Sequence, residues 1–232
     1  MRRILLKLSG EALGGTEGQG YDSSTLLNIS KELGELVHQG IQVAVVVGGG
    51  NLFRGIQGMS AGLERNTGDQ MGMLATIMNA LALSDFSRSL DIPAKVMSAF
   101  PVGSFVEGFS VKRALSYLED GVVVYFSGGT GNPFFTTDTA AALRAAEIGA
   151  DLLIKATKVD GVYDRDPLKY SGAVRYDSLS YEEVLQKKLQ VMDLTAFTLC
   201  QENNIPIRVV DLADDHSILR LAKGESVGTL IS

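Results

Sequence analysis

Short runs of apolar residues recur along the chain, and segments with helix-like spacing of apolar residues lie between them. Most of the runs are continuous rather than alternating, which is typical of β-strands that are covered on both faces. The runs that predict strands lie at residues 4–8, 43–47, 94–97, 122–126, 152–154, 205–210 and 228–231. The segments that predict helices lie at residues 26–37, 74–81, 111–118, 138–148, 184–197 and 218–222, the fifth being one broken helix or two short ones.

Strands that alternate with helices favour the α/β class with a mostly parallel sheet. The chain has no internal repeat and no low-complexity linker, and its five prolines are not clustered. We therefore expect residues 1–232 to form one domain, with residues 163–177 as a polar surface loop.

The composition narrows the class of protein. Of the 232 residues, 45% are hydrophobic and 21% are charged, which excludes a disordered, collagen-like or coiled-coil chain. The single cysteine, Cys200, excludes an internal disulfide and fits a reducing compartment. One cysteine and two separated histidines give no recognisable zinc cluster. No stretch approaches a membrane-spanning length, and Lys7 and Glu11 interrupt the N-terminal apolar run too soon for a signal peptide.

The net charge of −6 and the absence of any run of lysines or arginines argue against general binding of nucleic acid. A chain this acidic can still bind an anionic ligand, but the positive charge must then be local. The ends of the predicted strands are where such charge matters, because ligands of an open α/β sheet bind beyond the carboxyl ends of its strands.

Two glycine-rich segments follow predicted strands. Residues 48–50 are three consecutive glycines whose backbone N–H groups can approach an oxyanion, and Arg54 can add a bidentate phosphate contact. Residues 127–138 combine glycines, hydroxyl groups and the start of an alanine-rich helix, which together favour anion binding. The structural alternatives are a tight turn with a surface arginine and an ordinary loop that ends in a helix cap. The candidate caps are Thr136, Thr137 and Asp138.

Two lysines stand at the ends of predicted strands. Lys7 ends an apolar run and precedes a Ser-Gly pair, and Lys155 precedes a polar turn that contains Asp160. A lysine in such a place either extends to the surface or directs its charge at a phosphate, because an unpaired buried ammonium group is costly. Each lysine alone is weak evidence, but the two together with two glycine-rich loops favour a phosphate site.

These features fit phosphoryl transfer, which depends on positioning and charge neutralisation rather than on a covalent nucleophile. The sequence lacks the P-loop motif, the protein-kinase motifs, a dinucleotide-binding G-x-G-x-x-G after a strand and a G-x-S-x-G hydrolase elbow. The chain therefore belongs to none of these phosphate-binding or hydrolytic classes.

Seven ordered motifs between Lys7 and the C-terminus resemble those of the bacterial uridylate (UMP) kinases, within the amino acid kinase superfamily. The motifs are KLSGEAL, VVVGGGNLFRG, GDQMGMLAT, GGTGNPFFTTDTAA, KATKVDGVYDRDP, VMDLTAFTLC and GTLIS. The resemblance implies a three-layer α/β/α sandwich around a largely parallel mixed sheet. It also implies the reaction of ATP with UMP to give ADP and UDP with Mg²⁺, in the synthesis of pyrimidine nucleotides.

The resemblance also implies where each substrate binds. The implied ATP residues are Lys7, Leu8, Ser9, Gly10, Gly50, Arg54, Thr157, Tyr163 and Asp166. The implied UMP residues are Gly49, Asp69, Thr130, Gly131, Asn132, Pro133, Phe134, Phe135, Thr136 and Thr137. The structural alternatives are a favourable charge near a helix N-terminus for Asp69 and core packing for the two phenylalanines.

Charge arguments within these motifs make Lys7, Arg54, Asp138 and Lys155 the candidate catalytic residues. The three cations would neutralise the charge that spreads over the transferred group. Asp138 would repel a phosphate unless it orients a lysine or a hydrated Mg²⁺, and its alternative role is a helix cap. Asp193 is a weaker candidate for a second orienting carboxylate, and we assign no direct metal ligand.

Members of this family are typically cytoplasmic homohexamers that GTP activates and UTP inhibits. The segment that resembles the GTP-linked stretch comprises Gly15, Thr16, Glu17, Gly18, Gln19 and Gly20. Gln19 replaces a common phenylalanine, which leaves the strength of GTP control open. Two rival functions also stay open at this point: a superfamily enzyme that phosphorylates a carboxylate or carbamate, and a nucleotide-binding sensor or storage protein without turnover.

Overall fold

The computed structural model describes residues 2–53, 62–167, 169–214 and 216–232, and its centre is a nine-stranded sheet. The strand order is β4-β3-β5-β2-β1-β6-β10-β11-β9. Within this order only the pairing of β10 with β11 is antiparallel among the described strands. The strands are β1 (Arg3–Leu8), β2 (Gln42–Val47), β3 (Ala94–Ser98), β4 (Glu107–Gly108), β5 (Val123–Ser127), β6 (Leu152–Thr157), β9 (Ser178–Leu179), β10 (Ile207–Asp211) and β11 (Thr229–Ile231).

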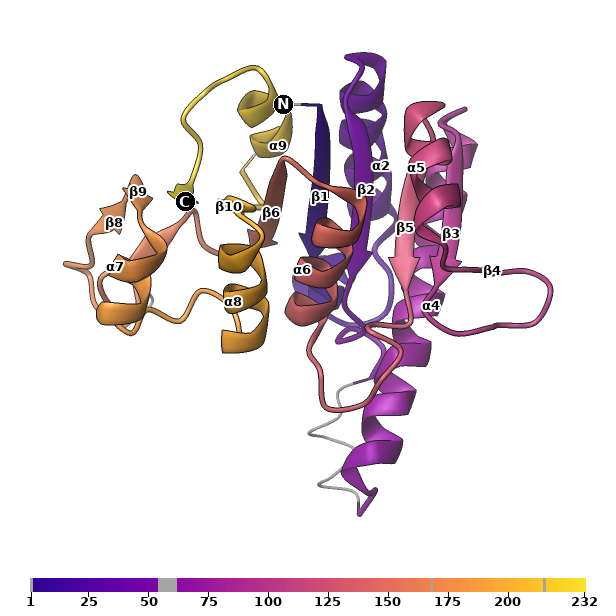
Figure 1. Cartoon of the computed structure of the whole chain (residues 1–232), viewed down its shortest axis with the longest axis horizontal. Coiled ribbons are helices and arrows are strands. Elements are labelled where there is room, and N and C mark those ends of the chain that lie inside the picture. The colour runs from indigo at the N-terminus through magenta and orange to yellow at the C-terminus, as the bar shows by residue number, and fades with distance from the viewer. Residues whose placement is uncertain (1, 54–61, 168, 215) are drawn as a thin grey trace.

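Helices cover both faces of this sheet (Figure 1). One core packs α2, α4 and α9 against the sheet, and a second core packs α5, α6, α7 and α8 against the opposite face. The α-helices of the two layers are α2 (Ser23–His38), α4 (Arg65–Ser89), α5 (Val111–Glu119), α6 (Thr137–Ile148), α7 (Tyr181–Gln186), α8 (Leu194–Glu202) and α9 (Ser217–Ala222). The predicted three-layer α/β/α sandwich is confirmed.

Coverage on both faces explains why the strands are continuous apolar runs. In β1, Ile4 and Leu6 pack into the core with α2, whereas Leu5 packs into the core with α6, and all three are fully buried. Alternate residues of a strand point to opposite faces, so both sets must be apolar when both faces are covered.

Helix α4 is longer than predicted, Arg65–Ser89 against residues 74–81, and several short elements were not predicted, including β4 and β9. Residues 163–177 are not simply a loop, because β7 (Val162–Tyr163) and β8 (Arg175–Tyr176) pair as an antiparallel two-stranded sheet. A short α1 (Gly10–Leu13) and the 3-10 helix η1 (Gly15–Glu17) also went unpredicted. The unpredicted short strands and helical turns contain too few residues to show a hydrophobic period. The segment 184–197, predicted as one broken helix or two short ones, forms two helices, α7 and α8.

Strands β2, β1, β6 and β10 run parallel, so their carboxyl ends meet at one edge of the sheet, and α4 extends beyond that edge (Figure 1). The register places Lys7 of β1 directly beside Lys155 of β6. Helix α6 begins at the same edge with Thr136 as its cap, whose hydroxyl accepts from the N–H of Thr139 at 3.1 Å. No described helix is long and apolar enough to cross a membrane.

Candidate active site

Lys7 and Lys155 meet a single carboxylate at the carboxyl edge of the sheet. The Nζ atom of Lys7 lies 2.7 Å from Oδ1 of Asp138, and the Nζ atom of Lys155 donates to Oδ2 of Asp138 at 2.7 Å. Lys155 also donates to the carbonyl oxygen of Val191 at 2.6 Å. The two lysines and one aspartate of this cluster carry a net positive charge among themselves, and their side chains are 11–17% exposed.

Two effects determine the pKa shifts in this cluster: burial of the charged groups, and the sharing of the Asp138 carboxylate by two lysines. Burial alone would raise the pKa of Asp138, but the ammonium groups of Lys7 and Lys155 outweigh it and hold that pKa below its usual value. Burial is the largest cause that lowers the pKa of Lys155, and the carboxylate of Asp138 opposes it. Asp138 is therefore ionised near neutral pH and keeps both lysines in place.

The cap alternative for Asp138 is wrong, because the side chain of Thr136 caps α6. A second carboxylate, that of Asp193 at the start of α8, holds the Thr136 side chain in its capping position. Asp193 accepts from the hydroxyl groups of Thr136 and Thr139, and it also caps α8 by accepting from the N–H of Ala196 at 3.0 Å. The segment Val191–Asp193 thus holds both Lys155 and the first turn of α6.

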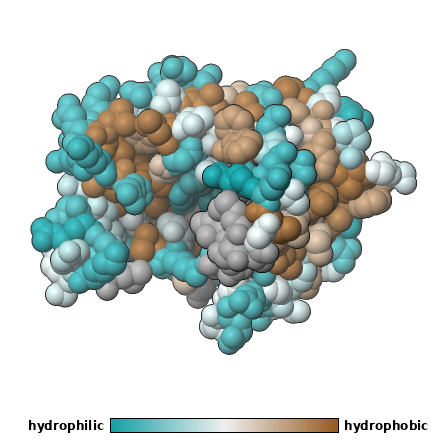
Figure 2. Space-filling model, turned by 90° about the horizontal axis from the view of Figure 1, so that it is seen from below, coloured by the Kyte–Doolittle hydropathy of each residue, from teal (hydrophilic) through white to brown (hydrophobic). Residues whose placement is uncertain are grey.

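A cavity of about 280 Å³ adjoins the glycine-rich loops on the α4 side of this edge. Seven residues with an implied role line it: Gly49, Gly50, Asp69, Asn132, Phe135, Thr136 and Thr137. Thr130, Gly131, Pro133 and Phe134 are not part of its lining, although they belong to the same loop. Seen from the carboxyl edge, the surface is a mosaic of hydrophilic and hydrophobic side chains (Figure 2). Arg54 lies outside the described residues.

Asp69 joins α4 to the loop that follows β5. Its Oδ2 atom accepts from the N–H of Phe134 at 2.8 Å and from Nε of Arg65 at 3.2 Å. Phe134 has a φ of 72°, and the hydrogen bond helps to hold this left-handed backbone. Phe134 and Phe135 are 65% and 52% exposed, so the core-packing alternative for them is wrong. Asp69 lies in the second turn of α4 and acts through this contact rather than through the helix terminus alone.

Thr76 and Met73 also line this cavity, although we did not predict them as site residues from the sequence. The hydroxyl of Thr76 accepts from the N–H of Gly128 at 2.8 Å and donates to the carbonyl oxygen of Met73 at 2.7 Å. Both residues fall in the motif GDQMGMLAT that carries Asp69, so helical spacing from Asp69 was the available signal.

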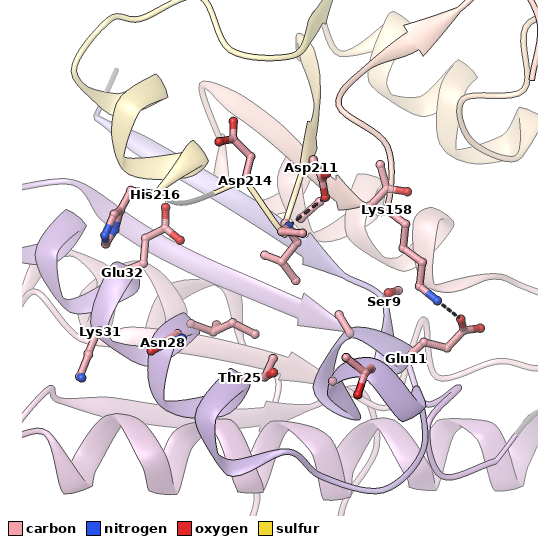
Figure 3. Close-up of a pocket in the computed structure, with 18 of the residues that line it drawn as sticks. Ser9, Glu11, Thr25, Asn28, Lys31, Glu32, Lys158, Asp211, Asp214 and His216 are labelled. Carbon is pink, nitrogen blue, oxygen red and sulfur yellow. Dashed lines mark hydrogen bonds and ion pairs between the residues drawn. The ribbon is translucent and has the colours of Figure 1, made fainter. Parts of the chain in front are cut away.

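A larger cavity of about 580 Å³ lies on the other side of the strand ends, between α2 and the segment that joins β10 to α9 (Figure 3). Its wall includes Ser9 and Thr157 of the implied ATP set and Gly15 and Thr16 of the implied effector segment. Ser9, Glu11 and Lys158 lie toward one end in Figure 3, and Lys31, Glu32 and His216 lie toward the other.

Carboxylates dominate the lining of the larger cavity. The described lining has five of them, Glu11, Glu32, Glu35, Asp211 and Asp214, against two lysines and one histidine. Lys158 pairs with Glu11 at 3.0 Å. Burial raises the pKa of Glu32, and hydrogen bonds from the N–H groups of Leu219 and Ile218 partly offset that effect. An excess of carboxylates in the lining is unfavourable for a polyanionic group such as a triphosphate.

Tyr163 and Asp166 line neither cavity. The hydroxyl of Tyr163 donates to Oδ1 of Asp160 at 2.5 Å, and this hydrogen bond is the largest cause that raises the pKa of Tyr163. Asp160 in turn pairs with Arg175 of β8 at 2.9 Å. The structure therefore places Tyr163 in the β7–β8 pair, beyond the end of β6.

No group of three or more histidine, cysteine, aspartate or glutamate side chains in the described residues could hold a metal ion. Each carboxylate oxygen of Asp138 already faces a lysine, so Asp138 does not fit the role of a direct metal ligand here.

A parallel α/β sheet with paired lysines, glycine backbone and a helix N-terminus at its carboxyl edge defines a class of phosphate-binding enzymes. The family model described as "Amino acid kinase family" matches residues 2–211. A uridylate kinase of Legionella pneumophila (strain Corby) is 55% identical over 99% of this chain and 94% of its own length. A uridylate kinase of Alcanivorax borkumensis is 56% identical over 99% of this chain and 91% of its own.

Solved structures agree with these relatives. The UMP kinase from Bacillus anthracis matches with a TM-score of 0.96 and 37% identity, over 100% of this chain and 96% of that one. The UMP kinase from Ureaplasma parvum matches with a TM-score of 0.94 and 34% identity, over 100% of this chain and 98% of that one. The chain belongs to the amino acid kinase family and, within it, to the uridylate kinases.

Proposed function

We propose that this chain is a UMP kinase, which transfers the γ-phosphoryl group of ATP to UMP and forms ADP and UDP. The observation that carries the proposal is the cluster of Lys7, Asp138 and Lys155 at the strand ends, beside a glycine-lined cavity of about 280 Å³. The uridylate kinases with 55% and 56% identity over nearly the whole chain support the same reaction.

For this reaction the protein has mainly to position the two substrates and to neutralise their charge. A phosphate oxygen of UMP attacks the γ-phosphorus of ATP, the bond from that phosphorus to the bridging β-γ oxygen breaks, and ADP leaves with the electron pair. The UMP oxygen is already ionised, so no strong base is needed. Lys7 and Lys155 stabilise the charge on the transferred group, and Asp138 orients both of them. Arg54 is the third cation in this proposal.

UMP occupies the smaller cavity in this proposal. The N–H group of Gly49 and the first turn of α6 face its phosphate, because backbone N–H groups at a helix N-terminus favour an anion, and Gly50 lies toward the phosphates of ATP. Asp69 shapes the loop that contains Asn132 and Phe135, and these residues surround the nucleoside. Thr130, Gly131, Pro133 and Phe134 support the loop from outside the cavity wall.

ATP lies with its phosphates over Lys7 and the backbone of 8–10, and its nucleoside extends past Thr157 toward Tyr163 and Asp166. The carboxylates of the larger cavity oppose a triphosphate there, which supports this direction. Mg²⁺ bound to the phosphates of ATP would supply further charge neutralisation beside Lys7 and Lys155.

The remaining parts of the proposal concern the cell and regulation. The protein works in the cytoplasm as a homohexamer, with GTP as activator acting through residues 15–20 and UTP as inhibitor. Gly15, Gly18 and Gly20 have φ values of 56°, 64° and 63°, so this segment has a backbone shape that other residues adopt with difficulty.

A release assay for ADP tests the function. Purified protein with ATP and Mg²⁺ is offered UMP, CMP, dTMP, aspartate, acetylglutamate and carbamate, each with and without GTP. Turnover confined to UMP is the expected result. Turnover with an acid alone would mean that the smaller cavity has been misassigned, and binding of ATP or UMP without turnover would favour a nucleotide sensor.

A further inference from the structure

Two buried asparagines connect the glycine loop to α4. Asn79 lies in α4 and is 0% exposed, and Asn51 directly follows the three glycines and is 5% exposed. The Nδ2 atom of Asn79 donates to Oδ1 of Asn51 at 2.7 Å, and Nδ2 of Asn51 donates to Oδ1 of Asn79 at 3.2 Å. The two side chains thus form a reciprocal amide pair.

The second N–H of each amide binds a backbone carbonyl. Asn79 donates to the carbonyl oxygen of Gly48 at 2.6 Å, and Asn51 donates to the carbonyl oxygen of Gly20 at 2.7 Å. The backbone of Asn51 also accepts from the N–H of Gly20 at 3.1 Å. All four side-chain N–H groups of the pair are used, so the pair has one favoured orientation.

The bond from Asn79 to Gly48 determines how the glycine loop presents its next N–H. The peptide that joins Gly48 to Gly49 is trans, so its C=O and N–H point in opposite directions. Because Asn79 holds the carbonyl of Gly48, the N–H of Gly49 points away from Asn79. No hydrogen bond of the described residues uses that N–H, and Gly49 lines the smaller cavity.

The atoms around the glycine loop (residues 48–50) leave it little room to shift if the hydrogen bond from Asn79 is lost. A Cβ atom on Gly49 would lie 2.8 Å from the carbonyl oxygen of Gly72, and one on Gly10 would lie 2.5 Å from the nitrogen of Gly50. The loop is therefore packed against α4 on one side and α1 on the other. In such a packed space, the direction of one peptide depends on its hydrogen-bond partner rather than on loop relaxation.

We propose that Asn79 is a positioning residue for UMP: through Gly48 it directs the N–H of Gly49 at the phosphate of the acceptor nucleotide. Asn51 completes the arrangement by fixing the orientation of the Asn79 amide. This inference rests on the proposed function, because it assigns UMP to the cavity that Gly49 lines.

The test replaces Asn79 with leucine, which has the same branching and number of side-chain heavy atoms but can form none of the hydrogen bonds. The matched control is Ser87→Ala, in the same helix, since Ser87 is also 0% exposed and loses a hydrogen bond to the hydroxyl of Tyr125. Steady-state kinetics and thermal melting are measured for both variants and the unaltered protein. We expect Asn79→Leu to raise the KM for UMP about tenfold or more, as for the loss of a hydrogen bond to a charged group, while the KM for ATP changes less than about threefold.

A merely structural role predicts a different result: both variants lower the melting temperature and neither changes the KM for UMP. That result would overturn the inference. If the unaltered protein and Ser87→Ala fail to turn over UMP, the proposed function fails instead, so the two failures are distinguishable.

Asn79→Asp keeps the shape of the side chain and covers the case in which the leucine variant does not fold. A carboxylate at this position would face the carbonyl oxygen of Gly48, whereas its protonated form can donate one hydrogen bond. We expect the KM for UMP of this variant to fall as the pH is lowered, relative to that of the unaltered protein at each pH. A KM ratio that does not change with pH would contradict the proposal.

Discussion

The two cavities at the carboxyl edge of the sheet lie close together but differ in what lines them. Glycine backbone, threonines and the start of α6 line the smaller one, and Asp69 is the only carboxylate in its described lining. The larger one has five carboxylates in its described lining. The glycine loop and the loop after β1 touch between them, since a Cβ atom on Gly10 would lie 2.6 Å from the carbonyl oxygen of Gly48.

This difference teaches how an acidic protein can bind two anionic substrates. The net charge of −6 is not spread evenly, because five carboxylates line the larger cavity beside α2, whereas Lys7 and Lys155 lie at the strand ends beside the start of α6. Local charge, rather than total charge, determines where a phosphate group can bind. The following variants test whether function follows this division.

Lys7→Met should have the largest effect, because it removes the positive charge nearest the proposed transfer point. We expect kcat to fall about 10³-fold, in the range for loss of one group that stabilises transition-state charge. Lys158→Met is the matched control, since Lys158 lines the larger cavity and is an exposed side chain that pairs with Glu11. Similar losses of kcat in both variants, measured by ADP release, would remove the distinction between the two sides.

Asp138→Asn should have the next largest effect, because it leaves two lysines facing each other without the carboxylate between them. We expect kcat to fall about 10²-fold, the lower end of the range for one electrostatic group. The change also has a signature in stability. The two lysines depress the pKa of Asp138 in the folded state, so its ionised form stabilises the fold above the pKa that it has in the unfolded chain.

That stabilisation should disappear as the pH falls through the depressed pKa. Thermal melting of the unaltered protein and of Asp138→Asn between pH 3 and 8 measures it. The difference in Tm should be largest near neutral pH and should shrink below about pH 4, where the unfolded carboxyl group is protonated. A difference that grows toward acid would show that the lysines do not stabilise this carboxylate.

Asp69→Asn should have a smaller effect that is confined to UMP. The variant removes the charge that accepts from the N–H of Phe134 and from Arg65, so the loop around the smaller cavity loses a constraint. We expect the KM for UMP to rise about tenfold, as for one hydrogen bond to a charged group, with the KM for ATP unchanged. Glu64→Gln, at an exposed position beside the start of α4, is the control and should leave both KM values unchanged.

Glu35→Gln should have the smallest effect, because Glu35 lies on α2 in the wall of the larger cavity and Lys7 and Lys155 are not part of that wall. We expect kcat and both KM values to stay within about twofold, since an exposed charge is screened by salt. A marked fall in the KM for ATP would mean that the triphosphate enters the larger cavity after all. The measurement is the same ADP-release assay at physiological ionic strength.

Several elements of the site were predictable because local chemistry marks them. A lysine at the end of an apolar run, three glycines after a strand, and an alanine-rich helix preceded by hydroxyl groups are each visible over a few residues. The cap of α6 is one of the three candidates that the sequence offered, and Thr136 takes that role. The short β7 and β8 were not predictable, because two residues show no period and their pairing depends on residues far along the chain.

Other features depend on contacts between distant segments. The register of β1 with β6 brings Lys7 beside Lys155, and Asp138 reaches both only because α6 begins at the same edge. Contacts between distant segments also produce the amide pair of Asn51 and Asn79 and the separation of the two cavities.

The sequence by itself determined the α/β class, the strands that are covered on both faces, and the residue types that can bind phosphate. Hydrophobic period and glycine placement act over short distances along the chain, so they can be read without the fold. Only the tertiary structure decided that one aspartate would serve two lysines and that the carboxylates would gather on the α2 side. Coulombic and hydrogen-bond energies depend on distance in space, and distance in space is set by strand order and helix packing.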